Sequence, residues 1–530
     1  MALRLITGRS GQGKTEYLVQ EVIRLSMENP QQKYYVIVPE QFSLEMQRKM
    51  VKKHPRHGFF NIDVLSFHRL AYRIFDECGY QPGEILEDLG VSMMLRKILS
   101  EGENNFLYFK KSMKKAGFID ELKSMLMEFI GYGVTWEQVE EVSEKLGENK
   151  ALSNKCKELG RIYEHFDKAI EGRFMVTEQI LDVAREFAKE APMLTNAVFY
   201  FDGFAGFTPV QLAFLKELLK VAGQINVTIT IPEFVPGQRG MPEDLFTSSK
   251  KTGDALLMLC QENMQEVEEV VKLDTPVSPR FINNPELAFL EKNLFQNSRK
   301  IYSKKIERIH MTVCHNPDGE ADYVMHKIEQ LVRQKGYRYR DFAVLSGDVA
   351  DYASAFKRKA AILNIPVFED TKKKVSYHSG VEAVRSLFHL AQMEYSYESV
   401  FRYLKSGMSN LIDEDADYLE NYVLYAGVRG YSMWKKPFYR RLKNKDEAAI
   451  KALLLLQEKF MEETENFCSV MRDKEASVRD KIEVLYHTMV KLSFEEKLKN
   501  QAQKAEENSD FVKAAEYRQL YDLLLSLMDK

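Results

Sequence analysis

A glycine-rich segment near the start of the chain constrains the fold more than any other feature of the sequence. It reads Gly8-Arg9-Ser10-Gly11-Gln12-Gly13-Lys14-Thr15 and fits the pattern Gly-x4-Gly-Lys-Thr. Residues 3–7 precede it and predict a short buried strand, and residues 16–27 follow it and predict an amphipathic helix. A strand, a glycine loop and a helix start in this order predict a P-loop, whose backbone N–H groups converge on phosphate oxygens.

The residue types in this loop predict which atoms would hold a nucleoside triphosphate. Glycines let the backbone approach the phosphates without a Cβ clash, Lys14 would reach the β- and γ-phosphates, and the Thr15 hydroxyl would hold Mg²⁺. We therefore expect ATP and Mg²⁺ as ligands. The ATP-binding residues expected are Gly8, Ser10, Gly11, Gln12, Gly13, Lys14 and Thr15. The alternative is a chance glycine-rich turn.

A second nucleotide motif is expected where the apolar segment 198–201 runs into Asp202. Walker-type ATPases place an Asp there that orders the water around Mg²⁺, and many follow it with a Glu that acts as base for the attacking water. Here Gly203 follows, and glycine supplies no base. The sequence predicts that Thr15 and Asp202 hold Mg²⁺ in a site that binds nucleotide but hydrolyses it poorly. The alternative is that Asp202 only caps the following turn.

Strands alternate with helices in the first eighty residues and again from residue 197, which predicts a doubly wound parallel sheet. Between these parts, residues 86–189 predict an inserted helical subdomain, and a helix is expected at residues 254–268. A second α/β segment follows, and residues 380–530 predict helices throughout. The strands expected in the two α/β parts are residues 34–38, 62–65, 197–202, 225–231, 310–313, 342–345 and 365–368.

Composition limits the partners that the whole surface can attract. The 530 residues are 45% apolar and 29% charged, as in a globular protein of several domains, and the formal net charge is −3. A near-neutral surface has no global field for nucleic acid, so any DNA contact must be local. Five cysteines without a C-x-x-C pair predict reduced thiols in a cytoplasmic protein. No apolar run of about 18 residues occurs, so we expect no membrane span.

Several phrases resemble the motifs of superfamily 1 helicases of the UvrD/RecB type. They are the glycine loop, segments 38–43 and 65–72, Asp202-Gly203-Phe204 where these motors have Asp-Glu-Phe, and segments 339–345 and 364–367. The residues in these segments are more similar to one branch of these helicases, the B subunit of the bacterial AddAB (RexAB) helicase–nuclease. The phrases that carry this closer resemblance are the glycine loop and segments 36–42, 65–75, 201–204 and 207–209. It covers nearly the whole chain.

This resemblance implies an α/β fold of the P-loop NTPase (RecA-like) type with large all-α insertions. Residues 1–80 and 190–280 would form the first RecA-like domain (1A-like), and residues 81–189 a helical insertion (1B-like). Residues 286–378 would start a second RecA-like domain (2A-like), which stays incomplete, and residues 379–530 would form a helical subdomain (2B-like). The helical pattern still runs at residues 529–530, so we expect the natural protein to continue.

The resemblance also implies a function. The chain would be the N-terminal helicase-like part of a subunit that processes DNA double-strand ends for recombinational repair. It would work beside an A subunit, contact single- and double-stranded DNA, guide one strand and take part in recognising the Chi sequence. A nuclease domain and a 4Fe-4S cluster, both implied for the full-length protein, would lie beyond residue 530.

Departures from the helicase pattern imply a motor that has lost activity. The Glu is missing at Gly203, Ser346-Gly347 stand where active motors carry an Arg, and Pro232-Glu233 replace a Gly-Asp-x-x-Gln motif. The resemblance then assigns the active motor to the A subunit. The alternative is a small-molecule P-loop enzyme such as a nucleotide kinase, which needs no Glu at this position. A third possibility is a nucleotide-bound scaffold without turnover.

Two parts of the chain are candidates for DNA contact. By resemblance, His68 and Arg69 would lie near the path of the single strand. Basic and aromatic residues interleave in segment 431–443, where bases could stack on rings while cations hold phosphates. The candidates there are Trp434, Lys435, Lys436, Arg440 and Arg441. The alternative is a solvated basic loop whose aromatic residues anchor the helical subdomain.

Overall fold

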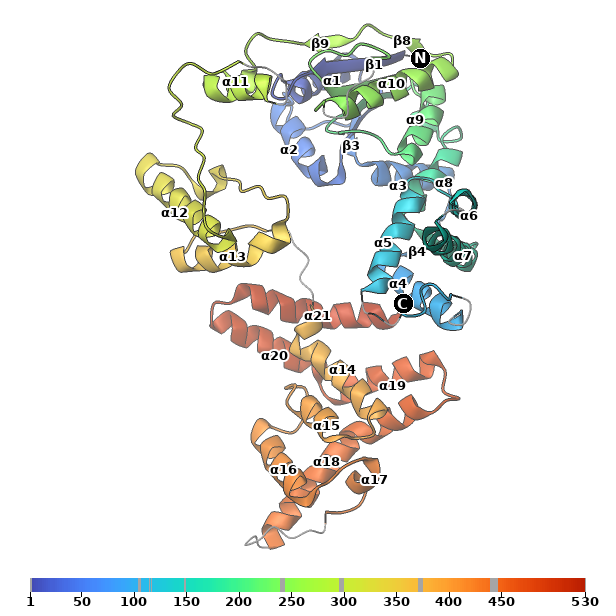
Figure 1. Ribbon diagram of the computed structural model, residues 1–530, viewed down its shortest axis with the longest axis vertical. Helices are drawn as coiled ribbons and strands as arrows, with labels where there is room; N and C mark the ends of the chain where they lie inside the picture. Colours follow the sequence, from blue (N-terminus) through green and yellow to red (C-terminus); the bar gives the residue numbers. More distant parts are fainter. Residues whose placement is uncertain are drawn as a thin grey trace. The chain divides into compact units, whose positions relative to one another are not determined.

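The chain folds into two units, residues 1–312 and residues 313–530. The computed structural model describes residues 2–102, 106–113, 115, 117–146, 149–238, 244–294, 300–369, 375–438 and 447–529. Figure 1 draws the first unit in blue to yellow-green and the second in yellow to red. No helix within these described ranges is both long and apolar enough to cross a membrane.

A parallel β-sheet forms the centre of the first unit, as the sequence predicts. Its strand order is β3-β2-β6-β7-β1-β8, and β9 also pairs with β1. All of these pairings are parallel. The strands are β1 (Ala2–Gly8), β2 (Tyr34–Ile37), β3 (Ile62–Leu65), β6 (Val198–Phe201), β7 (Gln224–Thr230), β8 (Glu266–Val267) and β9 (Val271–Leu273). The five strands expected in this part of the chain are therefore confirmed, with bounds within one residue.

Helices cover both faces of this sheet because side chains alternate along each strand. Tyr34 and Val36 pack against one pair of helices, α1 (Lys14–Glu28) and α2 (Ser43–Lys53). Tyr35 and Ile37 of the same strand pack on the opposite face. The helices of that face are α3 (Phe67–Cys78), α8 (Ile180–Glu186), α9 (Pro209–Val221) and α10 (Thr247–Glu262). This α/β arrangement carries the carboxyl ends of β1, β6 and β7 to one edge.

The inserted helical part of the first unit has a core of its own. Its helices are α4 (Asp88–Glu101), α5 (Phe118–Gly131), α6 (Trp136–Lys145) and α7 (Lys150–Ile170). A two-stranded parallel sheet of β4 (Glu84–Leu86) and β5 (Phe174–Val176) joins the start of this part to its end. Helices thus make up most of this part, and β4 and β5 form a short sheet that the sequence did not indicate.

Helices make up the described part of the second unit. A small apolar cluster lies between α12 (Pro317–Lys335) and α13 (Val349–Leu363). A much larger core follows. It is built from α14 (Ser379–Gln392), α15 (Tyr397–Leu404), α16 (Asp413–Ala426), α17 (Tyr431–Trp434), α18 (Glu447–Arg472), α19 (Val478–Lys491), α20 (Phe494–Glu507) and α21 (Phe511–Asp529).

The three strands expected in the second α/β segment are wrong. Residues 310–313, 342–345 and 365–368 form no strand, although all lie within the described range 300–369. Their apolar side chains are largely in solvent: Met311 is 95%, Leu345 92% and Phe368 91% exposed. A strand is stabilised by hydrogen bonds to a neighbour and by burial of alternate side chains. These described segments pair with no neighbouring strand, and Ile365 is their one buried side chain. Apolar, β-branched composition alone therefore misled the prediction.

The end of the first sheet also differs from the expectation. The helix predicted at residues 254–268 begins earlier and ends earlier, as α10 (Thr247–Glu262), and β8 and β9 follow it. Pairing with β1 in the register Ala2 to Glu266 and Ile6 to Val271 holds these residues extended. Tertiary pairing here overrides local helix propensity.

Candidate nucleotide-binding site

The glycine loop lies at the carboxyl edge of the sheet. Strand β1 ends at Gly8 and helix α1 begins at Lys14, so the loop leads directly into a helix N-terminus. Gly11 and Gly13 have φ angles of 78° and 90°, a backbone conformation that other residues adopt only with strain. Gly11 and Gly13 are therefore required by the turn itself, and the N–H groups at the start of α1 add positive potential beside the loop.

Asp202 meets the loop from strand β6. Its carboxylate is 5% exposed and accepts a 2.7 Å hydrogen bond from Thr15 Oγ1 and a 2.6 Å bond from Thr228 Oγ1. Oxygen atoms of this kind are the ligands that Mg²⁺ prefers, and Mg²⁺ in phosphate sites commonly takes one or two protein oxygens beside the phosphates. The donor set of Thr15 and Asp202 therefore fits the metal that the sequence predicts. Thr228 was not predicted, because nothing near it in the sequence marks it.

Lys14 folds back over its own loop. Its Nζ donates hydrogen bonds to the carbonyl oxygens of Gly8, at 2.8 Å, and Arg9, at 3.1 Å. Burial, with a smaller contribution from the Arg280 guanidinium, lowers the pKa of Lys14 to about 8, although the Asp202 carboxylate acts in the opposite direction. The ammonium is still mainly protonated at pH 7, so the pocket holds a cation where phosphate would bind.

A cavity of 730 Å³ opens beside these residues. Such a volume is within the range of small-molecule and cofactor sites. Its walls come from the glycine loop, from residues 202–205 after β6, from Thr228 and Thr230 of β7 and from the start of α10. Arg280 and Glu291, which sequence reasoning missed, complete the lining from a later part of the chain.

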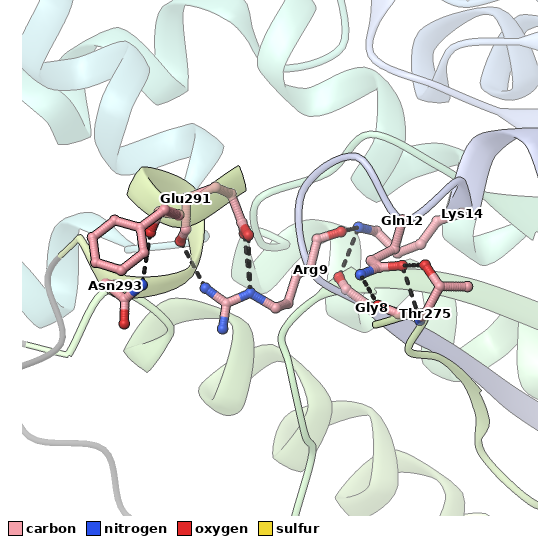
Figure 2. Close-up of polar contacts among 8 residues, drawn as sticks. Gly8, Arg9, Gln12, Lys14, Thr275, Glu291 and Asn293 are labelled. Atoms are coloured by element: carbon pink, nitrogen blue, oxygen red, sulfur yellow. Dashed lines mark hydrogen bonds and ion pairs between the residues drawn. The ribbon is translucent and has the colours of Figure 1, made fainter. Parts of the chain in front are cut away.

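The later segment, residues 273–293, lies against the glycine loop (Figure 2). Gln12 and Thr275 form three hydrogen bonds, two to Gln12 Oε1 at 3.1 and 2.6 Å and one from Gln12 Nε2 at 3.1 Å. Arg9 pairs with Glu291 at 3.1 Å and donates a 2.7 Å bond to its backbone carbonyl. A Cβ atom on Gly11 would lie 2.6 Å from Ser278 Oγ, so this contact also requires glycine.

Gly203, the residue after Asp202, has a φ of 81°. A Cβ at this position would touch the Pro39 ring at 3.5 Å, which is ordinary contact, so the constraint comes from the backbone angle. A Glu at this place would need a left-handed backbone that side chains disfavour. The backbone at this position is therefore shaped for glycine.

His68 and Arg69 lie in the first turn of α3, directly after strand β3 and its capping residue Ser66. The His68 ring is 3.6 Å from the Glu40 carboxylate, and Arg69 is exposed. Arg69 and the half-exposed Tyr72 line a second cavity of 550 Å³ between α2, β3 and α3. The structure thus brings a cation and an aromatic ring together, and Tyr72 was not among the residues predicted to contact DNA.

The structure contradicts the expectation that Trp434 stacks on a base. The indole is fully buried, with ring centroids 4.8 Å from Phe460 and 5.6 Å from Phe438. The alternative, an aromatic anchor of the helical core, is confirmed. Lys435 and Lys436 are exposed, and Lys435 pairs with Glu465 at 3.1 Å. Arg440 and Arg441 lie outside the described residues.

Comparison with known proteins gives the family. The fold and the site together define an α/β protein with a candidate nucleotide site at the carboxyl edge of a parallel sheet. Residues 5–291 match the family model described as "ADDB, N-terminal". The whole chain is 32% identical to the B subunit of an ATP-dependent helicase/deoxyribonuclease from Lachnoclostridium phytofermentans, of which it covers 47%. This chain therefore belongs to the AddB family, as the motifs indicated.

Other relatives agree. Proteins of the same name from Thermoanaerobacter sp. strain X514 and Clostridium botulinum strain Loch Maree are 32% and 29% identical over the whole chain. The chain covers 46% and 47% of them, so it spans about half the length of the curated relatives that it matches. The names of these relatives do not favour the nucleotide kinase alternative.

Proposed function

We propose that this chain is the helicase-like part of a B subunit that processes DNA double-strand ends together with a partner subunit. The relatives are named as a subunit of an ATP-dependent helicase/deoxyribonuclease, and the match extends over the whole chain. The observation that carries the proposal is the hydrogen bond between Thr15 and Asp202 beside a protonated Lys14. In this proposal the chain works in the cytoplasm beside an A subunit that supplies the active motor.

The nucleotide part of the proposal assigns the first unit to the P-loop NTPases. Lys14 and the backbone N–H groups of the loop would hold phosphate oxygens, and Thr15 and Asp202 would hold Mg²⁺, which neutralises phosphate charge when bound. Residues 1–80 and 190–280 form the RecA-like domain in this proposal, and residues 81–189 the helical insertion. Residues 286–378 are an incomplete second RecA-like domain, and residues 379–530 the helical subdomain.

Slow turnover follows from what this chain's residues can do. Hydrolysis needs a base that orients and deprotonates the attacking water, and Gly203 cannot supply it. Asp202 already accepts two hydroxyl hydrogen bonds, and in this proposal it would hold the metal. The site therefore binds ATP·Mg²⁺ and uses it mainly as a conformational ligand.

The DNA part of the proposal uses the edge of the sheet beyond β3. Arg69 offers a phosphate contact and Tyr72 a ring for base stacking, and both line one cavity. This arrangement suits a single strand that is guided along the protein. A share in Chi recognition belongs to the same proposal.

The test measures nucleotide and DNA binding by the chain and by its Lys14→Ala variant. ATP with a fluorescent label should bind the natural chain in the presence of Mg²⁺, and the variant should lose at least about tenfold in affinity because the phosphate cation is gone. Lys220→Ala, an exposed lysine paired with Glu217, is the matched control and should bind normally. DNA with a duplex end should be retained by the chain or by its complex with an A subunit. Nucleotide binding that survives Lys14→Ala, or no DNA binding in either form, would contradict the proposal.

A further inference from the structure

Helix α11 (Pro285–Asn293) connects the glycine loop to the segment that leads into the second unit. At its carboxyl end, Glu291 is paired with Arg9 of the loop. At its amino end, Glu286 accepts 2.8 Å hydrogen bonds from the backbone N–H groups of Glu307 and Arg308. Residues 307 and 308 lie five and four positions before Thr312, where the first unit ends.

Polar contacts, and very few apolar ones, hold α11 in place. Glu286 is the only buried residue of this described helix, and Leu290 is 38% exposed. The Arg9 and Glu291 side chains are 12% and 19% exposed, so their ion pair is largely shielded from water. Nearby, Ser278 Oγ is buried against Gly11 without a hydrogen-bond partner. A segment held in this way can detach without exposing a hydrophobic core.

The same contacts oppose an incoming polyphosphate. Glu291 lines the cavity that contains Lys14 and Thr15, so its carboxylate would repel phosphate oxygens there. Lys14 now donates to the carbonyls of Gly8 and Arg9, and a bound phosphate would compete with these carbonyls for its ammonium. Repulsion of the Glu291 carboxylate and a weaker bond from Lys14 to the Arg9 carbonyl would both affect Arg9, and Arg9 is the residue that pairs with α11.

We propose that the Arg9–Glu291 pair is an autoinhibitory latch, which triphosphate binding opens so that α11 is released from the glycine loop. The inference rests on the proposed nucleotide site. It adds that nucleotide binding changes the contacts of α11 with residues 307–308, and that this change does not require hydrolysis. A chain that lacks the hydrolytic base could still report bound ATP in this way.

The experiment compares the natural chain with Glu291→Gln, an isosteric change that removes the repelling charge and weakens the pair. ATP·Mg²⁺ and inorganic tripolyphosphate should both bind the variant at least about fivefold more tightly, which is the lower range of measured coupling between sites. The matched control is Glu262→Gln, because Glu262 is a half-exposed carboxylate of the same unit paired with Lys216. It removes the same charge away from the cavity and should leave affinity unchanged.

Hydrogen exchange provides the second measurement. In the natural chain, bound ATP·Mg²⁺ should increase exchange in residues 285–293 and at the amides of Glu307 and Arg308. In Arg9→Met this exchange should be high without nucleotide and should rise no further with it. The latch is refuted if Glu291→Gln binds no more tightly than Glu262→Gln, or if nucleotide leaves α11 equally or better protected. If the natural chain binds neither ligand, the proposed nucleotide site and the latch both fail; if it binds them and only the variants disagree, the latch alone fails.

Discussion

The Thr15 hydroxyl donates a 2.7 Å hydrogen bond to the Asp202 carboxylate, although 187 positions separate the two residues in the sequence. The strand order explains the contact. β1 and β6 both pair with β7, so their carboxyl ends reach the same edge of the sheet. Thr228, on β7 between them, donates to the other carboxylate oxygen. Three neighbouring strands thus build one small group of oxygens beside Lys14.

Asp202→Asn should remove the dependence of nucleotide affinity on Mg²⁺. The amide carries no charge, so it binds the metal far more weakly than the carboxylate does. The ratio of ATP affinities with Mg²⁺ and with EDTA should be well above one in the natural chain and near one in the variant. Asp182→Asn, at an exposed carboxylate paired with Arg185, should keep the natural ratio. An unchanged ratio in Asp202→Asn would show that Asp202 does not bind the metal.

Gly203→Glu should place a carboxylate after Asp202 but should not produce DNA-stimulated ATP turnover at the rate of an active motor. The left-handed backbone at φ 81° makes the variant less stable, by about 1–2 kcal/mol in the free energy of unfolding. DNA-stimulated ATP turnover should stay below about 1 s⁻¹, the low end of ordinary enzymes. Urea unfolding measures the change in stability, and a coupled ATPase assay measures the rate of ATP turnover. Gly117→Glu, at a φ of −80° with no atom near its Cβ, is the control and should unfold normally.

Trp434→Ala should destabilise the second unit by about 3–5 kcal/mol, as is usual for a large aromatic residue removed from a core. Trp434→Phe keeps an aromatic ring in the core and should retain the DNA affinity of the natural chain. Thermal unfolding and DNA retention separate the two effects. A tenfold loss of DNA affinity in Trp434→Phe with unchanged melting would mean that the indole contacts DNA after all.

The cysteines should differ in reactivity with iodoacetamide at pH 8. Burial raises the pKa of Cys260 and Cys468 to about 11, so very little of either is thiolate at this pH. Cys156 and Cys314 are partly exposed and should be alkylated first. Mass spectrometry of peptides gives the alkylation rate of each cysteine, and in denaturant all of these rates should become similar. Rapid labelling of Cys468 in the folded chain would show that the core around it opens easily.

The sequence predicted most of the first unit. Strand 62–65 has the expected bounds, because periodicity and flanking turn signals both act over short distances. The sequence also showed that Gly203 stands where many Walker-type ATPases have a Glu, since this difference depends only on which residue follows Asp202. The expected strands at 342–345 and 365–368 failed because strand formation depends on a neighbour, which local sequence does not encode.

The amino-acid sequence by itself determined the glycine loop, the family and the glycine that follows Asp202, since each depends on residues adjacent in the chain. Only the tertiary structure decided that Trp434 lies in a core, that Thr228 joins Asp202, and that Glu291 reaches Arg9 across 282 positions. Such contacts arise when the packed sheet brings distant strand ends together. Their energy comes from burial and geometry, and neither quantity can be computed from a residue's neighbours along the chain.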